Sequence, residues 1–216
     1  MRSLPGRRSL SIARQRLAFH GSAEYWEKNY RLGQTSGPGS YGELARGKAD
    51  FLNDFIRKRG IKTVTEFGCG DGNQLSLAEY PVYIGLDVSR SAIGICRQKF
   101  ANDLTKSFFL YDGACHVDRA GVFGADLVLS LDVIFHLVED SVFEKYMADV
   151  FGAGQNYVII YATNQTIRGT APHVRHRNFT QWVDGNIADW RLIQHMPGPG
   201  TDKIRADYFI YERSMS

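Results

Sequence analysis

Residues 66–72 read EFGCGDG, and this stretch decides how the chain folds. It follows a short apolar run at 63–65 and precedes a plausible helix, and a second apolar run at 82–86 then ends on Asp87. Glycines at alternate positions let the backbone turn sharply and approach a ligand where a Cβ would collide. The succession of strand, glycine turn, helix, strand and acid predicts a nucleoside-binding half-fold, in which Asp87 accepts hydrogen bonds from ribose hydroxyls.

The glycine spacing distinguishes two kinds of nucleoside cofactor. The dinucleotide fingerprint is G-x-G-x-x-G, but its last position, counted from Gly68, is Asn73 in this chain. A pyrophosphate binds helix N-terminal N–H groups that have no negative charge beside them, so we expect Asp71 to repel it. A cofactor with a cationic ammonium and sulfonium and no phosphate tolerates acids. The pattern favours S-adenosylmethionine (SAM), with a nicotinamide or sugar-nucleotide cofactor as the alternative.

The motif E-x-G-x-G-x-G, the acid Asp87 and the stretch DLVLSLDVIFHLVED at 126–140 carry a family resemblance. Over residues 60 to 165 the chain resembles the class I SAM-dependent methyltransferases. The resemblance implies an α/β, Rossmann-like fold with a seven-stranded, mostly parallel sheet flanked by helices, in which one strand is antiparallel. It also implies SAM as the methyl donor and S-adenosyl-L-homocysteine (SAH) as the product.

Length, composition and charge bound the class of protein. The 216 residues suit one α/β domain, and the 44% hydrophobic content is ordinary for a globular chain. Five arginines among residues 1–20 account for the positive net charge, because they leave 21 basic against 23 acidic residues elsewhere. We therefore expect no nucleic-acid groove. No apolar run approaches the roughly 20 residues of a membrane span, and three cysteines without metal-ligand spacing indicate a reducing, cytoplasmic location.

Apolar periodicity, caps and breakers predict three segments: a flexible basic arm at 1–22, a helical lid at 23–60 and the SAM-binding domain at 61–216. Within them we expect helices at 23–31, 43–59, 89–100, 138–151 and 179–187. We expect strands at 62–67, 82–86, 107–111, 126–131, 157–161, 191–195 and 208–211, the last two as a hairpin-like pair. Ligands are then expected at the carboxyl ends of the first four strands.

The resemblance assigns the cofactor contacts by position. Glu66 anchors the glycine turn, Asp87 takes the ribose hydroxyls and Val88 packs on the adenine. Asp112 is placed to accept from the adenine amino group, with an ordinary Asp-Gly turn as the alternative. The predicted cofactor set is Glu66, Gly68, Cys69, Gly70, Asp71, Gly72, Asp87, Val88, Asp112, Gly113, Leu131 and Asp132, of which the last two face the reacting methyl group.

Methyl transfer to an alcohol requires a base, and three histidines are candidates. His136 lies about one turn past the fourth expected strand, and His173 and His176 lie in the polar stretch after the fifth. The alternative for His136 is a packing role under the sheet edge. The chain shows no obvious metal-ligand spacing, so we expect no metal, with Mg²⁺ held by Asp132, Glu139 and Asp140 as the alternative.

The polar stretch after the fifth strand suggests how an acceptor is held. Arg175 and Arg177 suit an anionic or polyhydroxylated acceptor, with pairing to surface acids as the alternative. The stretches SGPGSYG at 36–42 and HVRHRNFTQW at 173–182 look like bacterial methyltransferases that modify glycans.

Aromatic residues near the N-terminus predict a cover over the cofactor. We expect Tyr25, Trp26, Tyr30 and Tyr41 to close over SAM and exclude water from the sulfonium, with the loop at 33–42 as part of the lid. The alternative is that this loop only links two helices.

These features together predict a methyltransferase that acts on a hydroxyl of a sugar or another small polar acceptor. An N-methyltransferase acting on a small amine or a protein side chain is the alternative. A non-enzymatic binding protein is disfavoured because the glycine turn and Asp87 are both intact, and a nicotinamide oxidoreductase is disfavoured by Asp71 and Asn73.

Overall fold

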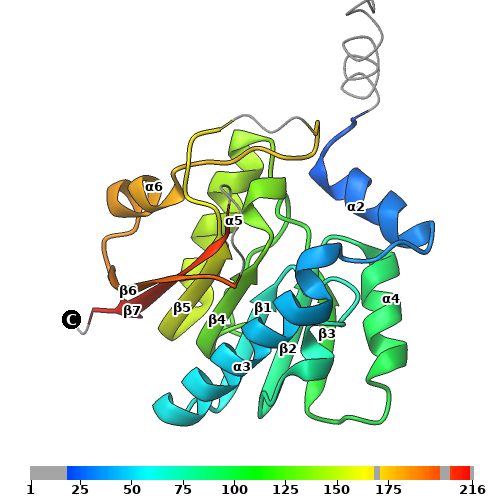
Figure 1. The fold of residues 1–216 in the computed structure, drawn as a ribbon, viewed down its shortest axis with the longest axis horizontal. Helices are drawn as coiled ribbons and strands as arrows, with labels where there is room; N and C mark the ends of the chain where they lie inside the picture. The colour runs from blue at the N-terminus through cyan, green and yellow to red at the C-terminus, as the bar shows by residue number, and fades with distance from the viewer. Residues whose placement is uncertain (1–18, 168–170, 200–204, 215–216) are drawn as a thin grey trace, which may run out of the picture.

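The computed structural model describes residues 19–167, 171–199 and 205–214, and it contains one seven-stranded sheet (Figure 1). The strand order is β3-β2-β1-β4-β5-β7-β6. Strands β1 to β5 are parallel to one another, whereas β7 is antiparallel to both β5 and β6. The predicted α/β class, the mostly parallel sheet and its one antiparallel strand are therefore confirmed. The strands are β1 (Thr63–Phe67), β2 (Val82–Asp87), β3 (Lys106–Leu110), β4 (Ala125–Leu131), β5 (Gly154–Ala162), β6 (Trp190–Pro197) and β7 (Asp207–Arg213).

Five helices surround the sheet within the described residues: α2 (Ser22–Arg31), α3 (Gly42–Arg59), α4 (Arg90–Lys99), α5 (Asp140–Ala153) and α6 (Phe179–Asn186). Local signals set their ends. Gly60 ends α3 in the left-handed conformation at φ 65°, and the Ser89 hydroxyl accepts a hydrogen bond from the N–H of Ala92 at the start of α4. Residues 1–18, which make up most of the predicted basic arm at 1–22, lie outside the described residues.

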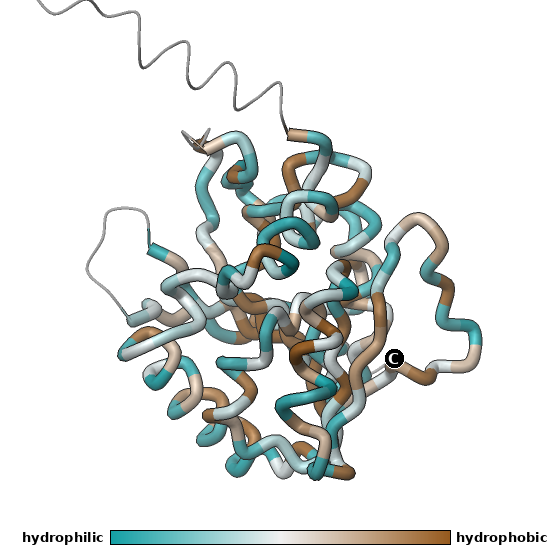
Figure 2. The backbone as a smooth tube through the Cα atoms, turned by 90° about the vertical axis from the view of Figure 1, so that its right-hand side faces the viewer, coloured by the Kyte–Doolittle hydropathy of each residue, from teal (hydrophilic) through white to brown (hydrophobic). Residues whose placement is uncertain are grey.

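Two apolar clusters form the core, one on each face of the sheet. Alternate residues of β4 divide between them, so that Val128 joins the cluster with α5 and α6, whereas Leu127 and Leu129 join the cluster with α3 and α4. A strand buried on both faces is apolar along most of its length, which explains the apolar run at 127–129. The buried Ser130 hydroxyl is hydrogen-bonded to the Tyr146 hydroxyl. Figure 2 shows hydrophobic stretches gathered in the middle of the molecule. None of the helices among the described residues is long and apolar enough to cross a membrane.

One predicted helix was wrong. The segment after the glycine turn forms only the short 3-10 helix η2 (Leu75–Leu77). Two side chains just before it bond to the preceding segment of the chain. The Asn73 amide donates to the Ser40 carbonyl, and the Gln74 amide donates to the Ala45 carbonyl. The chain then enters β2 directly after Pro81, so no room is left for a longer helix. A second 3-10 helix, η1 (Pro38–Ser40), lies in the predicted loop at 33–42.

Candidate active site

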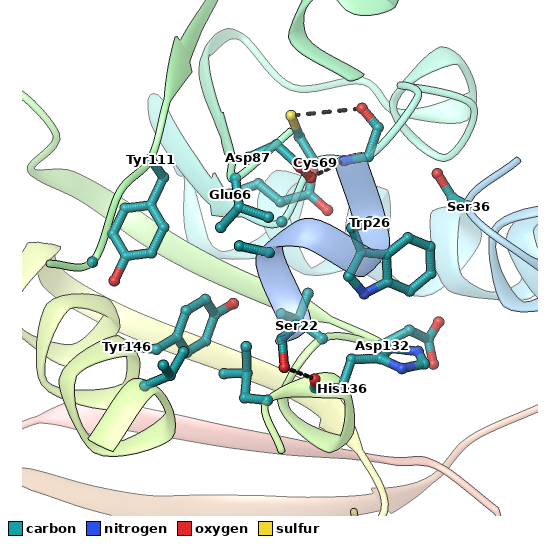
Figure 3. A pocket seen from close by; sticks show the side chains of 18 of the residues that line it. Ser22, Trp26, Ser36, Glu66, Cys69, Asp87, Tyr111, Asp132, His136 and Tyr146 are labelled. Carbon is teal, nitrogen blue, oxygen red and sulfur yellow. Dashed lines mark hydrogen bonds between the residues drawn. The ribbon is translucent and has the colours of Figure 1, made fainter. Parts of the chain in front are cut away.

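A cavity of about 630 Å³ opens at the carboxyl ends of β1, β2 and β4. Helix α2 covers one side of it, and residues after β3 and from α5 line another. Figure 3 shows its labelled side chains, with Tyr111 and Tyr146 on one side and Trp26, Asp132 and His136 on the other. From the predicted cofactor set, the lining includes Glu66, Gly68, Cys69, Gly70, Asp87, Val88, Asp112, Gly113, Leu131 and Asp132.

Asp87 ends β2 and organises the turn beside it. Its Oδ2 accepts a hydrogen bond from the N–H of Gly70 at 2.9 Å, and its Oδ1 accepts one from the N–H of Ser89 at 2.9 Å. Burial raises the pKa of Asp87 to about 6, against the opposing effect of these two bonds. The carboxylate therefore carries its charge at neutral pH and loses it in mild acid.

Glu66, at the end of β1, is a second buried acid in the cavity wall. Burial raises the pKa of Glu66 to about 7, although the hydrogen bond from Tyr83 and the charge of Lys48 both act to lower it. The Tyr83 hydroxyl donates to Glu66 Oε2 at 2.7 Å. The side-chain hydrogen bond to the Glu66 carboxylate thus comes from Tyr83 of β2.

The glycine turn requires glycine because other parts of the protein pack against it. Gly68 has φ 82°, and a Cβ there would lie 2.4 Å from a methyl group of Val133. Gly70 has φ 58°, and a Cβ there would lie 2.3 Å from the Ser36 hydroxyl. Both the backbone conformation and the neighbours exclude larger residues.

Asp71 lies outside the cavity lining, and its carboxylate binds the loop at 33–42. Asp71 Oδ2 accepts from the Ser36 N–H at 2.9 Å and from the Tyr41 hydroxyl at 2.8 Å, and the Asp71 N–H donates to Ser36 Oγ at 3.0 Å. The sequence suggested that Asp71 would repel a diphosphate, but its carboxylate bonds the loop and does not line the cavity. Gly72 also lies outside the lining, where its hydrogen atoms face Phe100 and Cys96.

Helix α2 is held against the rest of the protein at two points. Glu27 accepts hydrogen bonds at 2.7 Å from the hydroxyls of Ser89 and Ser91 at the start of α4. Ser22 donates from its hydroxyl to Glu139 Oε2, also at 2.7 Å. Of the aromatic residues predicted to cover the cofactor, Trp26 and Tyr30 line the cavity, whereas the described structure places Tyr25 and Tyr41 outside its lining.

The end of the cavity near β3 is built by two tyrosines. The Tyr146 hydroxyl donates to the Phe67 carbonyl at 2.9 Å, and the Tyr111 hydroxyl donates to Asp149 at 2.8 Å. These bonds fix the two rings beside Asp112 and Gly113, which also line the cavity.

His136 follows β4 in the short 3-10 helix η3 (Ile134–His136) and lines the opposite end. Its Nδ1 lies 3.1 Å from the carbonyl oxygen of His173. A carbonyl only accepts, so Nδ1 carries the proton and Nε2 keeps its lone pair. Burial lowers the pKa of His136 to about 4, so the ring is neutral at physiological pH. The Trp26 ring meets it edge-on, with centroids 4.9 Å apart.

The other predicted histidines lie outside the cavity lining. His173 stacks on Tyr25 with ring centroids 4.1 Å apart, and its carbonyl orients His136. His176 Nδ1 lies 2.6 Å from the Thr163 hydroxyl. Burial lowers the pKa of both rings. These positions suit supporting roles around His136.

Arg175 and Arg177 are engaged within the protein. Both form ion pairs with Asp140, at 2.9 and 3.0 Å, and both donate to the carbonyl of Val138. Arg177 also lies over the Phe143 ring. The two side chains stabilise the segment after His136, as in the alternative raised from the sequence, and neither lines the cavity.

The cavity lining also includes three charged residues that sequence reasoning missed, namely Lys48, Arg90 and Lys145. Lys48 of α3 is 1% exposed, lines the cavity and donates to Asp132 Oδ2 at 2.5 Å. The sequence held a signal for it, because Lys48 lies four residues after Leu44 and four before Leu52, within the apolar stripe of the helix. Within the described residues, no group of three or more His, Cys, Asp or Glu side chains is placed to hold a metal ion.

Comparison with known proteins relates this geometry to a fold. No protein-family model matches the chain. Over 112 residues, 47% of this chain, it is 30% identical to the small RNA 2'-O-methyltransferase of Arabidopsis thaliana. The matched stretch spans 12% of the length of that relative.

Solved structures match much more of the chain. The methyltransferase domain of bacterial CtHen1-C superposes with a TM-score of 0.65 at 17% identity, covering 80% of this chain and 100% of that domain. The N-methyltransferase NodS of Bradyrhizobium japonicum WM9, in complex with SAH, gives a TM-score of 0.69 at 14% identity, covering 90% of this chain and 100% of NodS. The chain therefore has the fold of class I SAM-dependent methyltransferases, as the sequence motif predicted.

Proposed function

We propose that this protein is a SAM-dependent methyltransferase that acts on a hydroxyl of a sugar or another small polar acceptor. The single observation that carries the proposal is the cavity that joins Asp87 and the glycine turn to the neutral, oriented His136. The end with Asp87 and the glycine turn has the chemistry needed to bind a nucleoside cofactor. The end with His136 has a group that can remove a proton from an acceptor.

The charges of the cavity fit SAM. Four acids line it, namely Glu66, Asp87, Asp112 and Asp132, against three basic residues, Lys48, Arg90 and Lys145. Two of its lysines are already paired, Lys48 with Asp132 and Lys145 with Asp149. Such a lining suits a cationic ligand better than a diphosphate. When bound, SAM supplies an electrophilic methyl carbon on a cationic sulfur and leaves as SAH.

Each part of the cavity would hold one part of the cofactor. Asp87 would accept hydrogen bonds from the ribose hydroxyls, as acids at this strand end do in nucleoside-binding folds. Val88, Tyr111 and Tyr146 give apolar surface for the adenine, and Asp112 lies beside them. The backbone of Gly68 to Gly70 would face the methionine portion.

His136 is the proposed general base. Its Nε2 is unprotonated because Nδ1 is committed to the His173 carbonyl, and its ring is neutral down to about pH 4. It can therefore take the proton that an alcohol loses as the new C–O bond forms. Trp26 packs edge-on against the ring and restricts its rotation.

We also propose that α2 and the loop at 33–42 cover the bound cofactor and exclude water. Trp26 and Tyr30 of α2 and Ser36 of the loop line the cavity. The hydrogen bonds of Asp71 to Ser36 and Tyr41 hold the loop in that position. All three cysteines are free thiols, which fits a reducing compartment, and we place the enzyme in the cytoplasm.

The test is methyl transfer from labelled SAM into fractionated cell extract, followed by mass identification of the product. We expect an O-methylated sugar or small hydroxylated compound. The relative from Arabidopsis thaliana is named for a 2'-O position, which is also a sugar hydroxyl. An N-methylated amine or protein side chain as the main product would replace this proposal with the alternative, and a wild-type protein that neither binds SAH nor labels anything would remove both.

A further inference from the structure

Asp132 has a backbone conformation that requires an explanation. Among the described residues it is the only non-glycine residue with a positive φ, at 60°. Its N–H donates to the carbonyl of Tyr161 at 2.9 Å, and Lys48 bonds its carboxylate. Positive φ is costly for a residue with a Cβ, and such residues cluster at functional sites where the surroundings hold them in place.

Lys48 is the partner that fixes Asp132. Its ammonium is buried, at 2.5 Å from Asp132 Oδ2 and 5.1 Å from the centre of the Tyr161 ring. Burying an ammonium is unfavourable unless it is paired, and a buried pair is a poor way to gain stability alone. The pair has no net charge, so it offers nothing to attract an anionic or a cationic acceptor over a neutral one.

The pair nevertheless retains hydrogen-bonding capacity. Asp132 Oδ1 accepts no hydrogen bond from any residue that the structure describes, and the Asp132 side chain is 21% exposed. Lys48 has three N–H donors, and one of them bonds Asp132. An acceptor atom beside a donor suits a hydroxyl group, which can donate to the first and accept from the second.

This hydroxyl-binding position lies at the reacting end of the cavity. In Figure 3, Asp132 lies on the same side as His136 and Trp26, away from Tyr111 and Tyr146. Trp26 contributes an apolar ring surface there, against which the carbon face of a sugar can pack. A base, an aromatic face and a hydroxyl-binding pair thus share one end.

We propose, resting on the proposed methyltransferase function, that Asp132 and Lys48 bind a second hydroxyl of the acceptor, adjacent to the one that is methylated. The acceptor is then a neutral sugar with a vicinal diol. His136 takes the proton from one hydroxyl, while Asp132 accepts from the neighbouring hydroxyl and Lys48 donates to it.

The first experiment tests the diol. Cell extract is oxidised with periodate, which cleaves the C–C bond of a vicinal diol to two carbonyls, and the reagent is consumed with ethylene glycol before labelled SAM and enzyme are added. We expect labelling to be lost relative to extract treated with quenched reagent. A ribonuclease-treated portion shows whether the sugar belongs to RNA or to a glycan or free sugar. Full labelling after oxidation, or an amine or carboxylate product, would overturn the inference.

The second experiment tests the two residues. The double variant Lys48→Met with Asp132→Asn removes both charges and leaves no unpaired buried ion. We expect about 10- to 100-fold less labelling, the effect of losing a charge-assisted hydrogen bond. SAH affinity should stay unchanged. Lys58→Met is the matched control, because Lys58 is 73% exposed on the same helix and should leave labelling unchanged.

The outcomes separate this inference from the function on which it rests. A wild-type protein that fails to bind SAH removes the proposed function itself. If the wild type binds SAH and transfers methyl groups, the proposed function stands. A double variant that then labels normally, or that loses affinity for SAH, overturns only the role of Asp132 and Lys48 in binding the acceptor. If the double variant does not fold, Lys48→Met alone is read in the same way, because the Asp132 carboxylate that it leaves without Lys48 is 21% exposed and can be hydrated.

Discussion

The His136 side chain is the residue on which the proposed chemistry most depends. We predict that His136→Ala lowers the turnover of a hydroxyl acceptor about 100-fold or more, the usual contribution of a general base. The affinity for SAH should not change, because the ring faces the acceptor end of the cavity. The measurement is the initial rate of labelling at saturating SAM.

The matched control is His195→Ala, because His195 lies on β6 with its side chain 52% exposed. It should leave the rate unchanged. Undiminished turnover in His136→Ala would remove His136 from the mechanism.

Asp87 should give cofactor binding a pH dependence. Its pKa is raised to about 6 by burial. In the proposed complex the ribose hydroxyls donate to the ionised form. As pH falls through 6 the carboxylate becomes protonated, so SAH affinity should fall about tenfold per unit below that value. Affinity should be level above it. Isothermal titration between pH 5 and 8 measures this.

Two variants assign that pH dependence. Asp87→Asn should bind SAH weakly at every pH, whereas Glu66→Gln should retain the fall in acid. If Glu66→Gln abolishes the fall and Asp87→Asn keeps it, then Glu66, whose pKa is about 7, is the group responsible.

Gly70 should tolerate no side chain. At φ 58°, with a Cβ only 2.3 Å from Ser36 Oγ, Gly70→Ala should destabilise the protein by about 1–3 kcal/mol. Gly94→Ala is the control, since Gly94 lies within α4 with no heavy atom within 4 Å of the new Cβ. There alanine should stabilise by up to about 1 kcal/mol, because glycine costs that much inside a helix. Urea unfolding compares the two, and equal stability of Gly70→Ala and wild type would contradict the packing described for the turn.

At the scale of elements, the glycine turn and the segment before β1 form one hydrogen-bonded unit. The Asp71 carboxylate accepts hydrogen bonds from Ser36 and Tyr41. The Asn73 amide donates to the Ser40 carbonyl, and the Gln74 amide donates to the Ala45 carbonyl. The one position where the sequence departs from the dinucleotide fingerprint, Asn73, is therefore one of those that attach the N-terminal segment.

We predict that Asp71→Ala loosens the loop at 33–42. Three hydrogen bonds to that loop are lost or weakened, so cleavage within 33–42 by a protease should become faster than in wild type. Asp54→Ala is the control, since Asp54 forms an ion pair with the exposed Lys58 on α3, far from the loop in sequence. SAH should slow cleavage in wild type, and a rate indifferent to both SAH and Asp71→Ala would end the idea of a cover.

At the scale of the whole molecule, the sheet was predictable because its signals are local. Alternating or continuous apolar runs, Gly60 and Ser89 mark the elements at their own positions, and right-handed crossovers then fix which strand ends face the ligand. The part of the cavity proposed for the cofactor followed from the same reasoning, since Glu66, Gly68 and Asp87 line the cavity and lie at or next to predicted strand ends.

The rest of the cavity depends on long-range packing that no local signal reports. Lys48 reaches the cavity because α3 packs on one face of the sheet and brings Lys48 to Asp132, just after β4, and Tyr146 reaches it from α5. Arg175 and Arg177 looked like acceptor ligands in the sequence, but Asp140, 35 or more residues earlier, takes both. The identity of such partners requires the fold.

The account's central claim is that the cavity beside residues 66–72 binds an S-adenosyl ligand, and calorimetric titration tests it most directly. The full chain is titrated with SAH and, separately, with NAD, and each titration is repeated with Asp87→Ala. The account predicts saturable one-site binding of SAH that Asp87→Ala weakens strongly, and no heat of binding for NAD. Binding of NAD in place of SAH, or SAH binding that is indifferent to Asp87→Ala, would contradict it.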